Sequence, residues 1–135
     1  MSDVPRLYRV VIQVSDLDKA ASFYGQLLDT EGRRIPGQRH YFDCGPVILA
    51  VLDPTPPGER NKARPNPDHI YFSVADLEKV HARARKLGCL AKGQVHGEGA
   101  GKIVARPWGE RSFYAEDPFG NPLCFVDEGT IFTGR

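Results

Sequence analysis

The sequence predicts an α+β fold in which two βαβββ modules follow each other and form a curved mixed-sheet cleft. Three features predict this fold. The segments VVIQVSDL (residues 10–17) and IYFSVADL (residues 70–77) form a short internal repeat, and such a repeat sets the architecture of the whole chain. Each copy is followed by a helical pattern of apolar residues. Each half then ends in several short runs typical of strands.

Each repeat begins with a strand and continues into a helix. Residues 10–14 and 70–74 alternate between two faces and are rich in β-branched and aromatic residues, which is typical of strands. Ser15 or Asp16 in the first copy, and Asp76 in the second, suit the N-cap of the helix that follows. Apolar residues then recur every three or four positions, at Leu17, Ala20, Ala21, Tyr24, Leu27 and Leu28 in the first helix and at Leu77, Val80, Ala84 and Leu87 in the second.

The remainder of each half indicates three further strands. We expect them over residues 31–36, 39–44 and 46–53, and over residues 89–96, 110–116 and 122–128. The segment DPFGN (117–121) consists largely of turn-forming residues and predicts a hairpin. The predicted organisation is one domain over 1–135, with a first module (7–53), a proline-rich linker (54–68), a second module (69–128) and a tail (129–135).

Composition excludes several classes of function. The chain has 135 residues, with 18 Lys and Arg against 17 Asp and Glu, so its formal net charge of +1 gives no reason to expect nucleic-acid binding. Its apolar runs are far shorter than the ~20 residues of a membrane span, and charged residues interrupt the first twenty positions. We therefore expect no membrane partner and no secretion signal. Three widely spaced cysteines (Cys44, Cys89 and Cys124) fit reduced thiols and a cytoplasmic location.

The faces of the first strands that point away from the helices are candidates for a binding site. They carry Arg9, Val11 and Gln13 in the first module and His69, Tyr71 and Ser73 in the second. Two such faces brought together would form a cleft with a few polar groups, which is the usual form of a small-molecule site. Arg9 would need a partner there, either an internal acid or an anionic ligand.

Residues 7–128 resemble the vicinal oxygen chelate superfamily, which contains glyoxalase I, bleomycin resistance proteins, extradiol dioxygenases and fosfomycin resistance enzymes. The resemblance is carried by the duplicated βαβββ pattern, by VSDLDKAASFYGQLL (14–28) and by DPFGNPLCFVDE (117–128). It implies the glyoxalase/bleomycin resistance/dihydroxybiphenyl dioxygenase-like fold. The PWG-x-R-x-F pattern at 107–113 resembles bleomycin-resistance-like members that lack the full set of metal ligands.

The resemblance also implies where metal-dependent members would hold a divalent ion. The four family ligand positions fall at Arg9, Ala50, His69 and Cys124. An arginine has no lone pair to donate and an alanine has no donor atom, so we expect no metal and no other cofactor at the usual centre. The alternative is a displaced metal site that uses His40, His69, Cys124 or Glu110.

The segment 105–125 contains further candidates for ligand binding. It holds the single tryptophan, Trp108, followed by Glu110, Arg111 and Phe113, and strand alternation places Arg111 and Phe113 on one face. Either Trp108 stacks on a ligand that Arg111 orients, or Trp108 plugs the end of the cleft and Arg111 pairs with an acid such as Glu110 or Asp117. Both interpretations remain open at this point.

Two residues are candidates for catalysis. His69 suits general acid–base chemistry near neutral pH, although a lone histidine on a strand is more often structural. Cys124 would act as a nucleophile only if His69 lay close to it and its thiol pKa were lowered. The tail contains Ile131 and Phe132, which either contact a partner or cap the cleft.

The sequence thus predicts a protein that binds a small organic molecule in the cleft between the modules, without the usual four-ligand metal centre. The ligand would be anionic if Arg9 and Arg111 both face the cleft, whereas a near-neutral chain gives no reason to expect a cation such as bleomycin. The expected ligand-binding side chains are Arg9, Gln13, Tyr71, Trp108, Glu110, Arg111 and Phe113. The alternatives are a lyase, isomerase or dioxygenase with a rearranged metal site or a metal-free acid–base pair, and a non-catalytic interaction module. We expect a homodimer.

Overall fold

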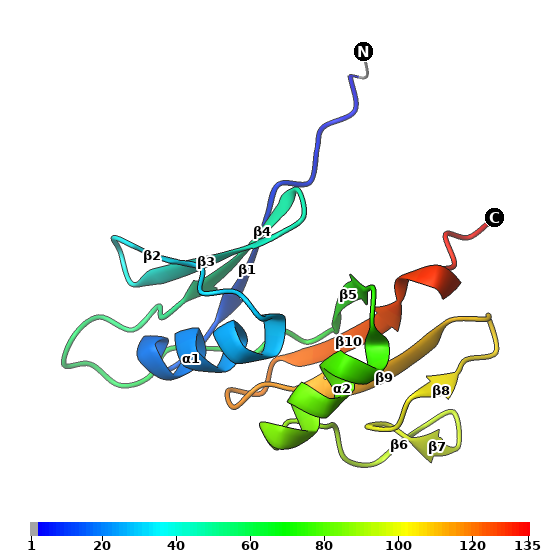
Figure 1. The fold of residues 1–135 in the computed structure, drawn as a ribbon. Helices are drawn as coiled ribbons and strands as arrows, with labels where there is room; N and C mark the ends of the chain where they lie inside the picture. Colours follow the sequence, from blue (N-terminus) through cyan, green and yellow to red (C-terminus); the bar gives the residue numbers. More distant parts are fainter. Residues whose placement is uncertain (1–2) are drawn as a thin grey trace. The chain divides into compact units, whose positions relative to one another are not determined.

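A computed structural model describes residues 3–135 and divides the chain into two compact units, one ending at Arg64 and one beginning at Pro65 (Figure 1). The division falls inside the proline-rich segment 54–68. Each unit contains one helix and one four-stranded mixed sheet, so the predicted α+β fold with two βαβββ-like modules is confirmed. Among residues 3–135, neither helix has the length and apolar character that crossing a bilayer requires.

Unit 1 has the predicted order of elements. They are β1 (Arg9–Gln13), α1 (Leu17–Leu28), β2 (Arg33–Ile35), β3 (Arg39–Cys44) and β4 (Val47–Leu52). The strands lie in the order β1-β4-β3-β2, with β1 parallel to β4 and the other neighbours antiparallel. The helix begins where Asp16 Oδ1 accepts a hydrogen bond of 3.0 Å from the Lys19 backbone N–H, so the N-cap is Asp16 rather than Ser15.

The core of unit 1 lies between α1 and one face of its sheet. The buried side of α1 presents Phe23, Tyr24 and Leu27, and the sheet contributes Ile12, Phe42, Leu49 and Val51 from three strands. Tyr24 and Phe42 are in ring contact, with centroids 6.1 Å apart. Burial of this apolar stripe against the sheet is what holds an amphipathic helix of twelve residues in place.

Unit 2 repeats this plan with additional segments. Its elements are β5 (Ile70–Val74), α2 (Leu77–Lys86), β6 (Gln94–Val95), β7 (Glu98–Gly99), β8 (Val104–Ala105), β9 (Arg111–Glu116), β10 (Pro122–Asp127) and the 3₁₀ helix η1 (Glu128–Thr130). The main sheet has the order β5-β10-β9-β8, while β6 and β7 form a separate ribbon (Figure 1). The side chains of Phe72, Phe125 and Phe113 stack in a row on the face that α2 covers.

The predicted strand over 89–96 is wrong. Only Leu90 forms a bridge, to Ala115, before the chain leaves the sheet for the β6–β7 ribbon. Positive φ angles at Gly93, His96 and Gly97 make the turns of this ribbon, and an extended strand cannot contain them. The short strand β8 takes the edge position beside β9 instead.

The hairpin predicted at 117–121 is confirmed, and it connects β9 to β10. Asp117 and Asn121 are both buried. One Asp117 carboxylate oxygen accepts from the backbone N–H groups of Phe119 and Asn121, each at 2.8 Å, and the other accepts from the Asn121 side-chain amide at 2.8 Å. The Asn121 side-chain oxygen in turn accepts from the Asn66 backbone N–H at 2.9 Å, so this turn also fixes the start of the unit.

Candidate functional site

The face of the unit 2 sheet opposite α2 carries most of the unit's candidate residues. Strand register places Tyr71 beside Cys124 and Cys124 beside Tyr114. One step along, Ser73 pairs with Val126 and Val126 with Ser112, so these six side chains share one face. We call this surface the open face of unit 2.

A hollow of about 490 Å³ lies on the open face, and we call it the open-face pocket. Its lining comes from β5, from the loop before β9, from β10 and from the C-terminal tail, and comprises Tyr71, Phe72, Ser73, Trp108, Glu110, Val126, Ile131 and Phe132. Tyr71 is 60% exposed, Phe132 52% and Trp108 38%. Of the sequence-predicted ligand-binding residues, the structure brings together Tyr71, Trp108 and Glu110 in this pocket.

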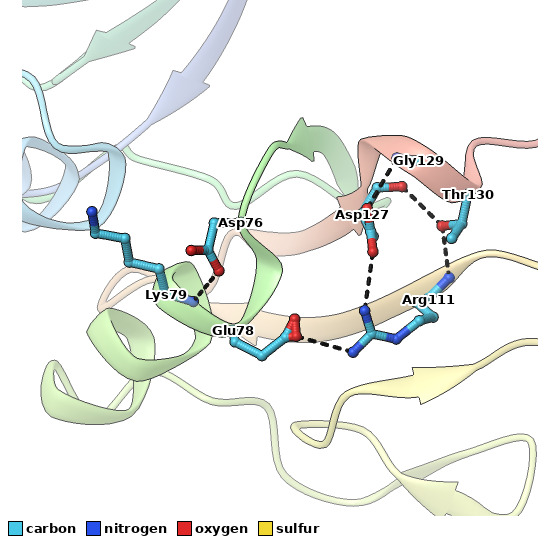
Figure 2. Close-up of polar contacts among 7 residues, drawn as sticks. All are labelled: Asp76, Glu78, Lys79, Arg111, Asp127, Gly129 and Thr130. Atoms are coloured by element: carbon cyan, nitrogen blue, oxygen red, sulfur yellow. Dashed lines mark hydrogen bonds and ion pairs between the residues drawn. The ribbon is translucent and has the colours of Figure 1, made fainter.

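Glu110 connects the walls of the pocket. One carboxylate oxygen accepts a hydrogen bond of 2.8 Å from Trp108 Nε1, and the other accepts one of 2.9 Å from the Phe132 backbone N–H. Thr130 fixes the start of the tail with two further hydrogen bonds. Its Oγ1 accepts from the Arg111 backbone N–H at 3.0 Å and donates to the Asp127 carbonyl at 2.8 Å (Figure 2). These hydrogen bonds hold the tail as one wall of the pocket, while the choice between capping the cleft and contacting a partner stays a prediction.

Arg106 is buried on the open face beside Ser112 and Tyr114, outside the lining of the pocket, and sequence reasoning missed it. Its side chain is only 4% exposed. Nε donates to Ser112 Oγ at 2.9 Å, Nη2 donates to the Ser112 carbonyl at 3.1 Å, and the guanidinium lies 4.8 Å from the centre of the Tyr114 ring. Among the described residues, Nη1 has no hydrogen-bond partner. The signal in the sequence was an arginine directly before the PWG turn, but strand alternation does not predict which way a loop residue points.

The two candidate catalytic residues lie in the same neighbourhood, in different environments. Cys124 is 1% exposed, and burial raises the pKa of its thiol to about 11, against the opposing effects of Ser112 and Arg106. The thiol is therefore protonated at neutral pH, which disfavours a nucleophilic role. His69 is exposed, and its ring meets the edge of Tyr114 with centroids 4.9 Å apart. Its acid–base role stays a prediction.

The residues at the family ligand positions do not fit a four-ligand divalent metal centre. In unit 1, Arg9 and Ala50 offer no electron pair to a cation. In unit 2, the buried Cys124 thiol has a raised pKa and lies near the Arg106 guanidinium, and a thiol must lose its proton to bind a metal. Among residues 3–135, no group of three or more His, Cys, Asp or Glu side chains is arranged to hold an ion.

His40, a candidate for a displaced metal site, already has both ring nitrogens engaged. The Arg34 Nε–H approaches Nδ1 at 3.4 Å, and Nε2 lies 2.9 Å from the Glu31 carbonyl. A neutral ring that accepts at Nδ1 and donates at Nε2 satisfies both contacts. The ring is also buried, with its centroid 4.8 Å from that of Phe42, on the face of the sheet that α1 covers.

Arg9 and Gln13 lie on the corresponding face of unit 1 and have partners within that unit. Arg9 donates to the hydroxyls of Tyr8 and Tyr41 at 3.1 and 3.2 Å, and its guanidinium lies 5.0 and 5.8 Å from the centres of their rings. Gln13 Oε1 accepts from the Arg64 backbone N–H at 2.9 Å. The structure gives Arg9 a pair of tyrosines as partners, which the sequence did not suggest, and its ligand-binding role stays a prediction.

Arg111 and Phe113 do not face the open-face pocket, so the structure does not support the ligand-binding role predicted for them. Arg111 donates to Asp127 at 3.0 Å and to Glu78 of α2 at 3.1 Å (Figure 2). The hydrogen bond that the guanidinium donates to Glu78 is the largest cause of the raised pKa of Arg111. Phe113 is fully buried, stacked on Phe125. Arg111 thus pairs with acids other than Glu110 and Asp117, and the choice between its two interpretations stays a prediction.

The chain is similar to several solved structures. They include the oxidase ChaP-H1 (TM-score 0.72, 22% identity, covering 93% of this chain and 97% of that chain) and a lactoylglutathione lyase from Agrobacterium tumefaciens (0.66, 22%, 94% and 96%). A third is a glyoxalase/bleomycin resistance protein from Albidiferax ferrireducens T118 (0.70, 19%, 90% and 98%). At these identities the likeness shows the fold alone. No curated protein matches the chain.

A family model matches most of the sequence. The model describes the Glyoxalase/Bleomycin resistance protein/Dioxygenase superfamily, and it matches residues 6–125, which include the whole first module and the second as far as Phe125 in β10. The sequence repeat, the order of the strands and this match agree. The chain therefore belongs to the glyoxalase/bleomycin resistance protein/dioxygenase superfamily.

Proposed function

We propose that this protein binds a small organic molecule with a flat ring system in the open-face pocket of unit 2. The observation that carries the proposal is the pocket itself, with a volume of about 490 Å³ and a lining of aromatic side chains around a single carboxylate. Sites for small molecules are commonly hollows of roughly 300–1,000 Å³ that are mostly apolar and contain a few fixed polar groups.

The polar groups of the pocket are few and well oriented. Glu110 is fixed by two hydrogen bonds, from Trp108 Nε1 and from the Phe132 backbone. Tyr71 and Ser73 add hydroxyl groups from neighbouring positions on one face of β5. A flat ligand would stack on the aromatic rings while these groups orient it.

The prediction of an anionic ligand loses its basis in the structure. It depended on Arg9 and Arg111 facing a common site. Arg111 is paired with two carboxylates, and Arg9 is held between two tyrosines of unit 1. Binding without the family's four-ligand metal centre, the homodimer and the cytoplasmic location stay predictions.

The proposal is tested by screening ring-containing compounds of positive, neutral and negative charge against the ¹⁵N-labelled chain and recording backbone amide shifts. Binding should shift the amides of Tyr71, Ser73, Glu110, Val126 and Phe132. The substitution Tyr71→Ala should weaken binding several-fold by removing a stacking ring, whereas Tyr8→Ala removes an equally exposed tyrosine from unit 1 and should have no effect.

A second hollow serves as an internal comparison. It has a volume of about 430 Å³ and lies beside the end of α1, lined by Ala21, Ser22, Gly25, Gln26, Asp29, Thr30 and Glu31. Shifts confined to that hollow, or no shifts with any compound, would contradict the proposed function.

A further inference from the structure

We infer that the ligand of the open-face pocket is an organic cation whose charge lies among the rings of Tyr71, Trp108 and Phe132 and faces the carboxylate of Glu110. The inference rests on the proposed function and adds to it the chemical class of the ligand. A flat molecule that carries a substituted ammonium or an amidinium group has this chemistry.

The three rings belong to segments that are far apart in the sequence, and they line one hollow. Tyr71 comes from β5, Trp108 from the loop before β9, and Phe132 from the tail. All three remain substantially exposed while lining it. The face of an aromatic ring carries partial negative charge, so several rings around one hollow attract a cation more strongly than they attract a neutral group of the same size.

The Glu110 carboxylate adds a full negative charge that the protein does not neutralise. Its two hydrogen-bond donors, Trp108 Nε1 and the Phe132 backbone N–H, are both uncharged. Within residues 3–135, no lysine, arginine or histidine forms an ion pair with it. A carboxylate can accept about four hydrogen bonds, so these two leave capacity for a ligand. By contrast, Asp127 is already paired with Arg111.

Electrostatic effects on neighbouring groups agree with this placement. Burial is the largest cause of the raised pKa of Tyr71, and the further causes, Cys124, Glu110 and Asp68, are all negative when ionised. The nearby positive group is Arg106, which opposes the rise in the pKa of Tyr114 and of Cys124. The Arg106 side chain is buried against Ser112 and the Tyr114 ring, on the same face of the sheet as the pocket, and it is not among the residues that line the pocket.

The inference reverses an expectation from composition. A net charge of +1 over 135 residues gives no reason to expect a cationic ligand. Net charge describes the long-range field, which salt screens over about 10 Å, whereas a bound ligand responds to the groups that touch it. In this pocket the charged group is an acid.

The test compares three small probes that share a benzene ring. They are benzyltrimethylammonium, its neutral isostere neopentylbenzene, and benzoate as the anion. The quaternary ammonium has no N–H to donate. The difference in affinity between it and the neutral isostere therefore measures the effect of charge without hydrogen bonding. Trp108 is the only tryptophan, which makes its fluorescence a reporter of the pocket in the full chain. The cation should bind about tenfold more tightly than the neutral isostere, and benzoate should bind most weakly.

Two variants assign the effect to particular groups. Glu110→Gln should weaken binding of the cation about tenfold and leave the neutral probe unchanged. Its matched control, Glu116→Gln, removes the same charge from an exposed position at the far end of β9. This control should change neither the binding of the cation nor the binding of the neutral probe. Because Glu110→Gln also removes an acceptor from the tail, Phe132→Leu provides an independent variant. This variant keeps Glu110 and most of the apolar volume but removes a ring. It should weaken binding of the cation more than binding of the neutral probe.

The outcomes separate this inference from the proposed function. If the neutral isostere or benzoate binds as tightly as the cation, the inference of a cationic ligand is overturned, whereas the proposal that the pocket binds a small molecule is retained. An equal loss in Glu110→Gln and Glu116→Gln would also overturn it, since the attraction would then come from the overall field. If none of the probes binds and Trp108 fluorescence does not change, both proposals fail for this pocket.

Discussion

The two units share one scaffold and differ in what lies on the open face of the sheet. In unit 1 the polar side chains of that face form hydrogen bonds with one another. Arg9 donates to the hydroxyls of Tyr8 and Tyr41, and Arg33 donates two hydrogen bonds to the Asp43 carboxylate, at 2.9 and 3.1 Å. In unit 2 the corresponding face holds exposed aromatic rings, a hollow and the buried Arg106, one nitrogen of which has no hydrogen-bond partner within residues 3–135.

The difference arises from the segments between the shared elements. In unit 1 the chain between α1 and β3 covers only residues 29–38, which include β2, whereas in unit 2 the chain between α2 and β9 covers residues 87–110. This longer segment supplies Arg106, Trp108 and Glu110, and the tail after β10 supplies Ile131 and Phe132. The comparison teaches that the two copies share the packed face of each sheet, while the longer segment and the tail of unit 2 supply several of the residues that line its hollow.

The largest expected effect concerns what the units have in common. Phe42 and Phe113 are both fully buried under their helices, on corresponding strands. Replacing either by alanine should lower the free energy of unfolding by about 3–5 kcal/mol, measured by urea denaturation. Phe113→Leu, which keeps most of the volume, should cost less than about 1.5 kcal/mol. A loss below about 1 kcal/mol for Phe113→Ala would contradict the view that both units depend on the same packed face.

A second prediction contrasts the two hairpins. Asp117 is buried and accepts three hydrogen bonds that define the β9–β10 turn, so Asp117→Ala should destabilise the protein by about 1–3 kcal/mol in the same urea measurement. Asp43, near the end of β3, is exposed, and Asp43→Ala should cost clearly less. If the two substitutions had equal effects, the turn network of unit 2 would not be the stabilising feature that its burial indicates.

The sequence was sufficient to predict the scaffold because its signals are local and occur twice. Asp16 and Asp76 cap their helices as the pattern indicates, each accepting from a backbone N–H three residues later. The apolar faces of β1 and β5 were also unambiguous, since one side of each strand is wholly apolar.

The site was harder to predict because its residues lack such periodic signals. In β9 both faces carry an aromatic ring, Phe113 on one and Tyr114 on the other, so alternation alone could not show which face meets α2. Arg111 was therefore assigned to the wrong side. Arg106 lies in a loop, where periodicity gives no direction, and its burial depends on contacts with Ser112 and Tyr114 that only the folded chain brings together.

A third prediction uses the cysteines, which differ between the units. Burial raises the pKa of Cys89 and of Cys124 in unit 2 to about 11, while Cys44 in unit 1 is only half-buried. The unfolded chain, with thiol pKa values of about 8.5, loses these protons first as pH rises. The stabilising contribution is therefore complete below pH ~8.5 and is lost as pH rises towards ~11.

Urea unfolding at pH 7.5 and 9.5 under reducing conditions tests the prediction about the cysteines. Each buried thiol should lower the free energy of unfolding by about 1 kcal/mol between these values. Cys124→Ala should therefore reduce the pH dependence, and Cys44→Ala should change it less. An unchanged pH dependence in Cys124→Ala would show that this thiol is not held in its protonated form by burial.

The smallest expected effect is the one that separates the two interpretations of Arg111 most directly. Its guanidinium joins β9 to α2 and β10 through Glu78 and Asp127, in pairs that remain partly exposed to solvent. Arg111→Gln should cause a small loss of stability that diminishes in high salt, because solvent ions screen such pairs. Probe binding, measured by Trp108 fluorescence, should be unchanged, since the side chain lies on the face opposite the pocket. A loss of probe binding with intact folding would instead place Arg111 among the groups that orient the ligand, and would restore the ligand-binding role that strand alternation left open.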